Sequence, residues 1–193
     1  MLATAAMRRA CTRTLCASPR VMRPTSQPTL SFDPSAKTAM DKQEPPAPGA
    51  DFRVVIVGAG NINFGSDEGP WNHSFRLEHK LGPRLKVVAL IDPDAERARR
   101  VLKTKCQSFV LSAYKDTVVY PTFKDYMASV CAETYPHAVW VGSPPAFRGG
   151  TEPGRNLEQL LTAGLPNVPL FIEKPVSTGA VDQTCLLYTS DAA

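Results

Sequence analysis

The chain has 193 residues, of which 43% are hydrophobic, and a formal net charge of +4. This length suits one globular domain with a tail, and no apolar run approaches the length of a membrane span. The excess charge lies in residues 1–50, with seven lysines and arginines against three acids, whereas residues 51–183 hold 15 against 14. The near neutrality of residues 51–183 excludes the basic footprint of a nucleic-acid-binding domain.

Residues 1–50 differ in composition from the rest, and we expect the folded structure to begin near Asp51. The first 32 residues contain five arginines and no acid, which is typical of a mitochondrial transit peptide. Alternatively, Met40 is the true start and the upstream residues are a translated leader. Residues 44–49 form a stiff, proline-rich linker. The predicted location is therefore cytoplasmic, or the mitochondrial matrix if residues 1–35 are a transit peptide.

The first predicted strand, residues 53–57, leads directly into Gly58-Ala59-Gly60. Its unbroken β-branched run is typical of a buried parallel strand. The two glycines let the backbone turn sharply and approach a dinucleotide pyrophosphate, whose charge then lies at a helix start. We therefore take four residues as phosphate-binding candidates, namely Gly58, Gly60, Asn61 and Ile62. Residues 61–72 are interpreted as an inserted loop, with Asn63 where the usual fingerprint has its third glycine.

The second predicted strand, residues 86–91, ends at Asp92. A carboxylate at this point can accept hydrogen bonds from both ribose hydroxyls of an adenosine, and it repels a 2′-phosphate, which favours NAD over NADP. Alternatively, Asp92 caps the helix that begins at Ala95. Basic residues then cluster along that helix, and we interpret them as a solvated face, with phosphate binding as the alternative; they are Arg97, Arg99, Arg100, Lys103 and Lys105.

Three further strands are expected at residues 117–120, 137–142 and 169–172, each preceded by a helix or loop. This alternation predicts an α/β fold with a doubly wound parallel sheet of the Rossmann type. One intervening helix carries an apolar stripe that would bury the thiol of Cys131; its members are Phe123, Tyr126, Met127, Val130 and Cys131. Another contains Leu157, Leu160 and Leu161 and ends at Gly164.

Ligands of such sheets bind at the carboxyl ends of the strands. Ser143 and Pro144 follow the fourth strand, and Glu173 and Lys174 follow the fifth. These residues complete the set of candidate cofactor-binding residues. A lysine partly desolvated at a strand end can act as a general acid or base, or hydrogen-bond a reacting oxygen as a cation. The alternative is a surface lysine paired with Glu173.

The segment Phe171-Ile172-Glu173-Lys174-Pro175 resembles the Glu-Lys-Pro signature of the Gfo/Idh/MocA oxidoreductases. Further features agree with that family: Gly58 and Gly60 after the first strand, Asp92 after the second, the Ser143-Pro144-Pro145 turn after the fourth, and His73 followed by Leu77 in the first helix. The resemblance covers about residues 51–183 and is greatest to fungal members. It implies an NAD(P)-binding Rossmann domain followed by a substrate domain that is missing here. In that family the signature lysine lies beside nicotinamide and substrate, which makes Lys174 the catalytic candidate.

The resemblance further implies an oxidoreductase that moves hydride to or from a sugar, a polyol or a related hydroxyl or carbonyl substrate. The alternative is a non-catalytic, dinucleotide-sensing regulator of the same family. The expected partner is a small-molecule substrate, without nucleic acid or membrane, and a homo-oligomeric state is left open. His73 could face the cofactor or pack, and His79 and His137 are interpreted as structural. We assign no metal, because the histidines lack metal-ligand spacing.

Residues 184–193 follow no pattern established before them and resemble translated sequencing-adapter sequence. We therefore expect a non-native tail there, with the natural protein continuing past Gln183. The predicted domains are accordingly a disordered or transit-like leader at 1–50, a Rossmann domain at 51–183 and the tail. Without the substrate domain, we expect the chain by itself to turn over no polyol.

Overall fold

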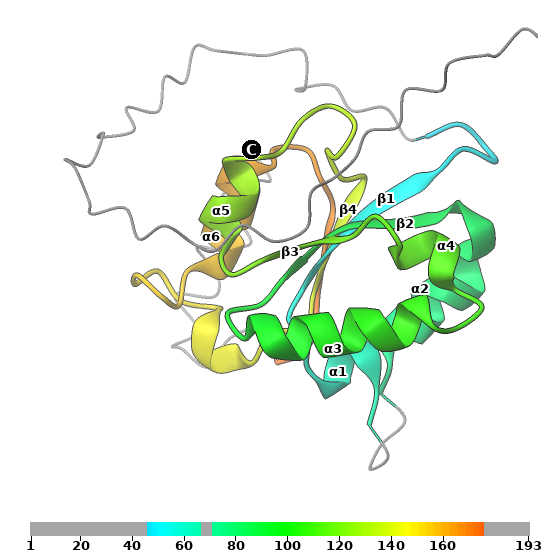
Figure 1. The fold of residues 1–193 in the computed structure, drawn as a ribbon. Coiled ribbons are helices and arrows are strands. Elements are labelled where there is room, and N and C mark those ends of the chain that lie inside the picture. Colours follow the sequence, from blue (N-terminus) through cyan, green and yellow to red (C-terminus); the bar gives the residue numbers. More distant parts are fainter. Residues whose placement is uncertain (1–45, 67–70, 176–193) are drawn as a thin grey trace, which may run out of the picture. The chain divides into compact units, whose positions relative to one another are not determined.

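The computed structural model describes residues 46–66 and 71–175, so that the leader up to residue 45 and the tail at 184–193 lie outside the described residues. Five parallel strands form the sheet of this part, in the order β3-β2-β1-β4-β5 (Figure 1). The predicted α/β class and parallel sheet are therefore confirmed. The strands are β1 Phe52–Val57, β2 Leu85–Ile91, β3 Val118–Tyr120, β4 Ala138–Val141 and β5 Leu170–Ile172.

The order of the strands reverses between β1 and β4. From β1 the chain builds outward through β2 to β3, and it then returns to place β4 on the other side of β1. The carboxyl ends of β1 and β4 consequently lie side by side, with Val57 opposite Val141. This is the switch point at which open sheets of this kind bind ligands.

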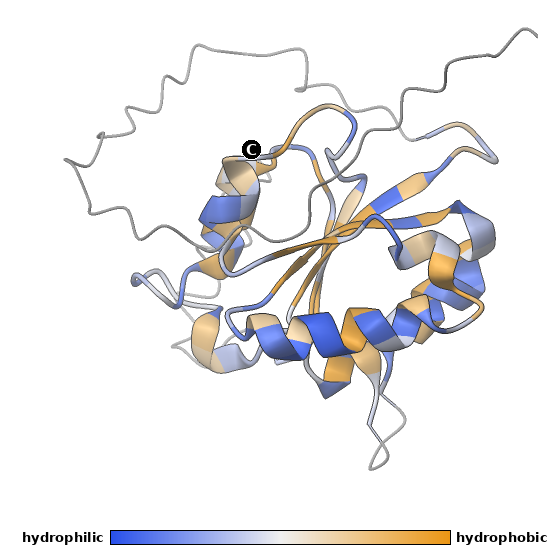
Figure 2. Ribbon diagram, in the orientation of Figure 1, coloured by the Kyte–Doolittle hydropathy of each residue, from blue (hydrophilic) through white to orange (hydrophobic). Residues whose placement is uncertain are grey.

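Helices cover both faces of the sheet, so the side chains of β1 are buried on both sides. Val54 and Ile56 pack toward a cluster with α2, α3 and α4, whereas Val55 and Val57 pack toward a cluster with α5 and α6. Successive side chains of a strand point to opposite faces, so an unbroken apolar run fills two cores. Figure 2 shows these strands as a band of hydrophobic residues between the helices.

The described part of the chain contains the helices expected from the sequence at Ala95, Phe123 and Leu157, together with other helices. Their bounds are α1 Asn61–Phe64, α2 His73–Leu81, α3 Ala95–Cys106, α4 Leu111–Tyr114, α5 Phe123–Met127 and α6 Leu157–Gly164, with short 3₁₀ turns at Gly82–Arg84 and Pro145–Phe147. The single turn α1 lies within the segment predicted as an inserted loop. It follows the glycine turn directly, and the Phe64 amide closes it on the Gly60 carbonyl at 3.1 Å.

Two expectations for the segment before β4 are wrong. The helix over residues 123–131 ends at Met127, and Cys131 is exposed rather than buried. The Ser129 hydroxyl bonds the Tyr126 carbonyl at 3.0 Å, and Thr134 then closes a tight turn on the Cys131 amide, also at 3.0 Å. Local side-chain bonds of this kind compete with helix continuation. The apolar stripe in the sequence therefore extends beyond the helix itself.

Candidate functional site

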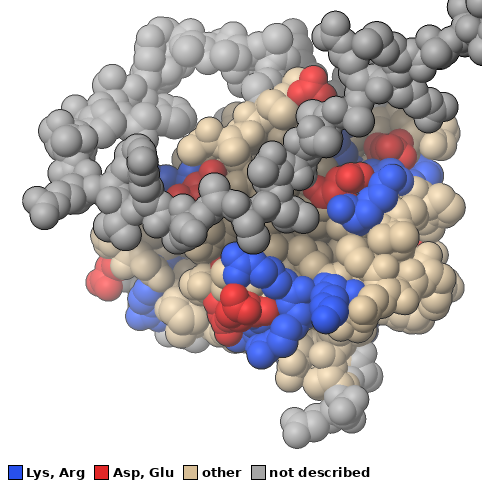
Figure 3. Space-filling view, in the orientation of Figure 1, with Lys and Arg blue, Asp and Glu red and all other residues tan. Residues whose placement is uncertain are grey.

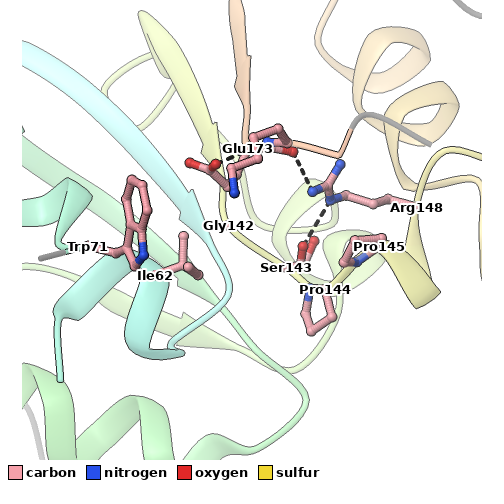
Figure 4. A pocket seen from close by; sticks show the side chains of 9 residues that line it. Ile62, Trp71, Gly142, Ser143, Pro144, Pro145, Arg148 and Glu173 are labelled. Atoms are coloured by element: carbon pink, nitrogen blue, oxygen red, sulfur yellow. Dashed lines mark hydrogen bonds between the residues drawn. The ribbon is translucent and has the colours of Figure 1, made fainter. Parts of the chain in front are cut away.

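A cavity of about 280 Å³ lies at the carboxyl ends of β4 and β5, beside the turn that follows β1 (Figure 4). It brings together five of the residues predicted from the sequence, Ile62, Ser143, Pro144, Glu173 and Lys174. Gly60 and Asn61 instead line a neighbouring hollow of about 180 Å³, on the side of α1 that faces α3. The remaining lining residues of the larger cavity are Trp71, Gly142, Pro145 and Arg148.

The two glycines of the turn have different roles. Gly58 has φ +96°, and a Cβ there would lie 3.1 Å from the amide nitrogen of Ser143, so this position needs glycine both for its conformation and for close contact with the end of β4. Gly60 has an ordinary extended conformation, with φ −82° and ψ 178°. A Cβ at Gly60 would meet nothing within 4 Å. The space beside it is therefore open to a ligand.

Asn63 takes the place of the third glycine and closes the turn with its side chain. It is 1% exposed, and its Nδ2 donates to the carbonyls of Val57 at 3.0 Å and Gly58 at 2.7 Å. Backbone carbonyls at a strand end need such donors once they are buried. Asn63 thus stabilises the turn by side-chain hydrogen bonds at the position where the fingerprint has glycine. The spacing of the motif alone did not reveal this role.

Asp92 is buried beneath the glycine turn. One carboxylate oxygen accepts from the Ala59 amide at 2.6 Å, and the other accepts from the Asp94 amide at 2.8 Å. Arg97 contacts both oxygens, at 2.8 and 3.1 Å. Asp92 thereby ties the end of β2 to the turn after β1.

The helix cap considered for Asp92 belongs to Asp94. Its side chain accepts from the Arg97 amide at 2.9 Å, at the start of α3. This backbone hydrogen bond is the main cause that lowers the pKa of the Asp94 carboxyl, and the charges of Arg97 and Arg100 act in the same direction. Asp94 is therefore a charged cap at the positive end of the helix dipole.

The Glu173 carboxylate is bound to the His73 imidazole rather than to the side chain of Lys174. The His73 Nε2 lies 2.5 Å from a Glu173 carboxylate oxygen, and the imidazole is 2% exposed, with the rings of Trp140 and Phe171 centred 5.6 and 5.2 Å away. The second Glu173 oxygen accepts from the Lys174 backbone amide at 3.1 Å. His73 thus fixes the Glu-Lys-Pro segment and does not line the larger cavity.

Lys174 extends to the mouth of this cavity. Its Nζ lies 5.3 Å from the ring centroid of Trp71, a cation–π distance. Within the described ranges the ammonium group makes no ion pair with a carboxylate, because Glu173 is engaged by His73. The interpretation of Lys174 as half of a surface pair with Glu173 is therefore wrong.

Arg148 is a site residue that reasoning from the sequence missed. Its side chain is 1% exposed, and its guanidinium donates to the carbonyls of Ser143, at 2.9 Å, and Glu173 (Figure 4). The guanidinium also donates to the carbonyl of Pro175 at 2.8 Å. It also lies 4.0 Å from the carboxylate of Glu158 on α6. One buried arginine therefore joins the turn after β4 to the Glu-Lys-Pro segment. Nothing in a lone arginine after two prolines distinguishes this role from a surface one.

Several features fit a bound dinucleotide. The open side of Gly60 leaves room for the close approach of phosphate oxygens. The hydroxyl of Ser143 is buried at the cavity and has no hydrogen-bond partner among the described residues, so it can serve a ligand. Lys174 supplies a cation at the mouth of the same cavity.

The described residues contain neither a cluster of possible metal ligands nor a helix that could span a membrane. They contain no group of three His, Cys, Asp or Glu side chains that could hold a metal ion. None of their helices is long and apolar enough to cross a bilayer. His79 and His137 both lie outside the cavity, and the His137 Nδ1 accepts from the Arg53 amide at 2.9 Å.

Solved structures of low sequence identity share this fold. A super-repressor mutant of Gal80p from Saccharomyces cerevisiae matches with a TM-score of 0.52 and 18% identity, over 74% of this chain and 32% of that one. The WlbA dehydrogenase of Bordetella pertussis, described in complex with NADH and UDP-GlcNAcA, matches with a TM-score of 0.50 and 14% identity, over 75% and 34%. At these identities the likeness concerns the fold alone.

Sequence relatives are closer. Two uncharacterized proteins of Schizosaccharomyces pombe are 44% and 41% identical to this chain over 135 and 143 residues, which is 69% and 72% of its length. The aligned part spans 35% of each relative, about a third. A family model described as an oxidoreductase family with an NAD-binding Rossmann fold matches residues 52–189. The chain therefore belongs to the GFO_IDH_MocA oxidoreductase family.

Proposed function

We propose that the full-length protein is a nicotinamide-dependent oxidoreductase that moves hydride to or from a hydroxyl or carbonyl carbon, on a sugar, a polyol or a related compound. The observation that carries this proposal is the placement of Lys174. Its ammonium lies over Trp71 at the mouth of a cavity formed at the switch point of the sheet, and Glu173, the nearest acid in the sequence, is held by His73. A lysine placed in this way is available for a reacting oxygen.

The nicotinamide, when bound, supplies or takes the hydride. Oxidation of an alcohol also releases the hydroxyl proton, and reduction of a carbonyl requires one. We assign that proton to Nζ of Lys174, which would accept it as the neutral amine in the oxidation and donate it as the ammonium in the reduction. As the ammonium it would also stabilise negative charge developing on the oxygen. The hydroxyl of Ser143 and the open side of Gly60 would receive polar groups of the nucleotide.

We propose NAD as the preferred nucleotide and NADP as the weaker ligand. Asp92 is fixed at the end of β2 by the Ala59 amide, and a carboxylate at that position disfavours a 2′-phosphate. The cytoplasm, or the mitochondrial matrix if residues 1–35 direct the chain there, remains the proposed location.

The test is a pair of measurements on the full-length protein. NADH binding is followed by titration, and nucleotide reduction is followed by absorbance during a screen of polyols, sugars and their acid derivatives. The proposal requires micromolar-range binding and turnover with at least one substrate, abolished by Lys174→Ala. Binding without any turnover would favour the dinucleotide-sensing regulator instead.

A further inference from the structure

We propose that Trp71 is a positioning residue for the proposed reaction: its indole face holds the Lys174 ammonium at the mouth of the cavity, where it is available to a reacting oxygen. The inference rests on the proposed function, because Trp71 acts through the lysine to which we assign the proton transfer. It adds a residue that influences the rate without taking part in the proton transfer itself.

Among the described residues, no acid holds the Lys174 ammonium. A cation on α3 shows the usual arrangement: Arg99 donates to Glu96 at 2.8 Å. Figure 3 shows acidic and basic side chains gathered over that helix. Glu173, the neighbour of Lys174, is instead engaged by His73. A lysine side chain loses much rotational freedom when it is fixed, so the position of this ammonium depends on another contact.

The indole of Trp71 supplies that contact. Nζ of Lys174 lies 5.3 Å from the ring centroid, inside the range of about 6 Å in which an aromatic face attracts a cation. Figure 4 shows Trp71 on the side of the cavity opposite Ser143 and Arg148. The ring attracts the ammonium through its quadrupole and adds no negative charge, so donors of the ammonium stay available for a reacting oxygen.

The cap of α2 fixes the place of Trp71. Asn72, the next residue, accepts through its Oδ1 from the Phe75 amide at 2.9 Å and from the Ser74 hydroxyl at 2.8 Å. Its Nδ2 donates to the Phe64 carbonyl at 3.2 Å, which ties the cap to α1. The backbone beside Trp71 is thereby held on two sides, so the indole has a defined position.

The start of α2 contacts both of the consecutive residues that follow β5. His73 binds the Glu173 carboxylate at 2.5 Å, and Trp71, two positions earlier, contacts the ammonium of Lys174. The first contact engages the acid that would compete for the ammonium, and the second provides an uncharged partner. One helix start therefore sets the surroundings of Lys174 in two ways.

The experiment compares Trp71→Leu and Trp71→Phe with the unchanged full-length protein. Leucine removes the aromatic face, and phenylalanine keeps a smaller one; since Trp71 is 44% exposed, both variants should fold. Phe75→Leu is the matched control, because Phe75 is an exposed aromatic residue of the same helix that does not line the cavity. The kcat is measured with the polyol or sugar that the screen finds to be turned over fastest, and NADH binding is measured by calorimetry.

Trp71→Leu should lower kcat by about twofold to thirtyfold, the range of a cation–π contact, and should leave the dissociation constant of NADH within about twofold. Trp71→Phe should fall between, and Phe75→Leu should change neither quantity. An unchanged kcat in Trp71→Leu would overturn this inference and leave the proposed function standing. An equal loss of kcat and of NADH affinity would do the same, because Trp71 would then be a wall of the nucleotide site.

A second measurement does not depend on activity. In full-length protein made with isotope-labelled lysine, the ring current of the indole should shift the ε-methylene protons of Lys174 upfield in the NMR spectrum. Trp71→Leu should abolish this shift, and Lys174→Arg assigns the resonance by its loss. Absence of the shift from the unchanged protein would overturn the inference even if the variants lose activity. Failure of the unchanged protein to turn over any substrate would overturn the proposed function and, with it, this inference.

Discussion

The carboxamide of Asn63 occupies the place where a Cβ on Gly142 would lie, so the residue that closes the turn after β1 also dictates glycine at the end of β4. Gly142 does not need a left-handed conformation, since the positive-φ glycines are others. Its smallness is required by Asn63, whose carboxamide atoms would lie 2.3–2.6 Å from such a Cβ. The two positions are therefore coupled through space and not through the backbone.

This coupling predicts a non-additive pair of substitutions. Gly142→Ala should lower the free energy of unfolding by about 1–3 kcal/mol through overpacking. Asn63→Ala should cost a similar amount, about 1–3 kcal/mol, because it removes both hydrogen bonds to the carbonyls of Val57 and Gly58. With the Asn63 amide gone, the methyl group introduced by Gly142→Ala has room, so the double variant should be more stable than the sum of the single effects. Urea denaturation measures all three, and strict additivity would refute the coupling.

Gly60→Ala should separate binding from stability. The residue has φ −82° and open space around its Cβ position, so the free energy of unfolding should change by less than about 0.5 kcal/mol. The added methyl would enter the space that we assign to the ligand. NADH affinity should therefore fall by about tenfold or more, equivalent to ~1.4 kcal/mol. Unchanged affinity in a calorimetric titration would remove Gly60 from the nucleotide site.

Lys174→Ala should lower kcat of the full-length protein far more than it weakens NADH binding. General acid–base groups contribute about 10²- to 10⁴-fold to rates, and a loss in that range is expected. Steady-state rates and a cofactor titration on the same variant give the comparison. Lys124→Ala is the control, since Lys124 is an exposed lysine on α5. A kcat equal to that of the unchanged protein would exclude Lys174 from the chemistry.

His73→Phe should destabilise the fold by leaving the Glu173 carboxylate unpaired in a largely buried position. We expect a loss of about 1–3 kcal/mol in the free energy of unfolding. Glu173→Gln in the His73→Phe background should recover part of the loss, because the buried charge is then gone. His79→Gln, on the exposed face of the same helix, should change stability by less than about 0.5 kcal/mol. Equal effects of the two histidine substitutions would contradict the assigned role of His73.

Protonation of His137 should lower the free energy of unfolding as the pH becomes acidic. Burial is the main cause that lowers its pKa below the usual 6.5, and the charge of Arg53 adds to it. The unfolded chain therefore binds a proton more readily than the folded one. The stability due to neutral His137 is present above about pH 6.5 and is lost as the pH falls through that value toward the lower folded pKa. Protonation at Nδ1 would also break the bond from the Arg53 amide.

His137→Asn keeps an acceptor for this amide but does not titrate. The variant should lose less stability than the unchanged protein as the pH falls from about 7.5 to about 5.5, a range that brackets the ordinary histidine pKa. Urea denaturation across this range, with carboxylate contributions cancelling in the difference, measures the effect. Parallel stability curves for the two proteins would exclude His137 as a source of the pH dependence.

The strands could be predicted because their residues leave few alternatives. An unbroken apolar run such as Val54 to Val57 is buried on both faces, and its ends are marked by Gly58 and by the charged residues before it. The positions of Ser143 and Lys174 followed from the rule that ligands bind at the carboxyl ends of parallel strands. These are consequences of local pattern and topology.

The contacts of the site could not be predicted in the same way. Arg148 and His73 act on Glu173 across 25 and 100 residues of sequence, and a single chain offers no periodicity that announces such pairs. Arg97 was interpreted as one of several solvated basic residues of a helix, whereas its partner Asp92 is buried. The end of α5 was also missed, because hydroxyl bonds in a turn override an apolar stripe.

The contact of Trp71 with Lys174 has a practical consequence, because the chain contains only two tryptophans. Trp71 lines the mouth of the cavity, and Trp140 is stacked on Phe171 with ring centroids 3.8 Å apart, next to the imidazole that holds Glu173. The tryptophan emission of this chain therefore reports on the mouth of the cavity through Trp71 and on the packing around His73 through Trp140. Unlabelled ligands, including those without a nicotinamide ring, can be followed by the change that they cause in tryptophan fluorescence. Trp71→Phe would show which of the two tryptophans gives the signal.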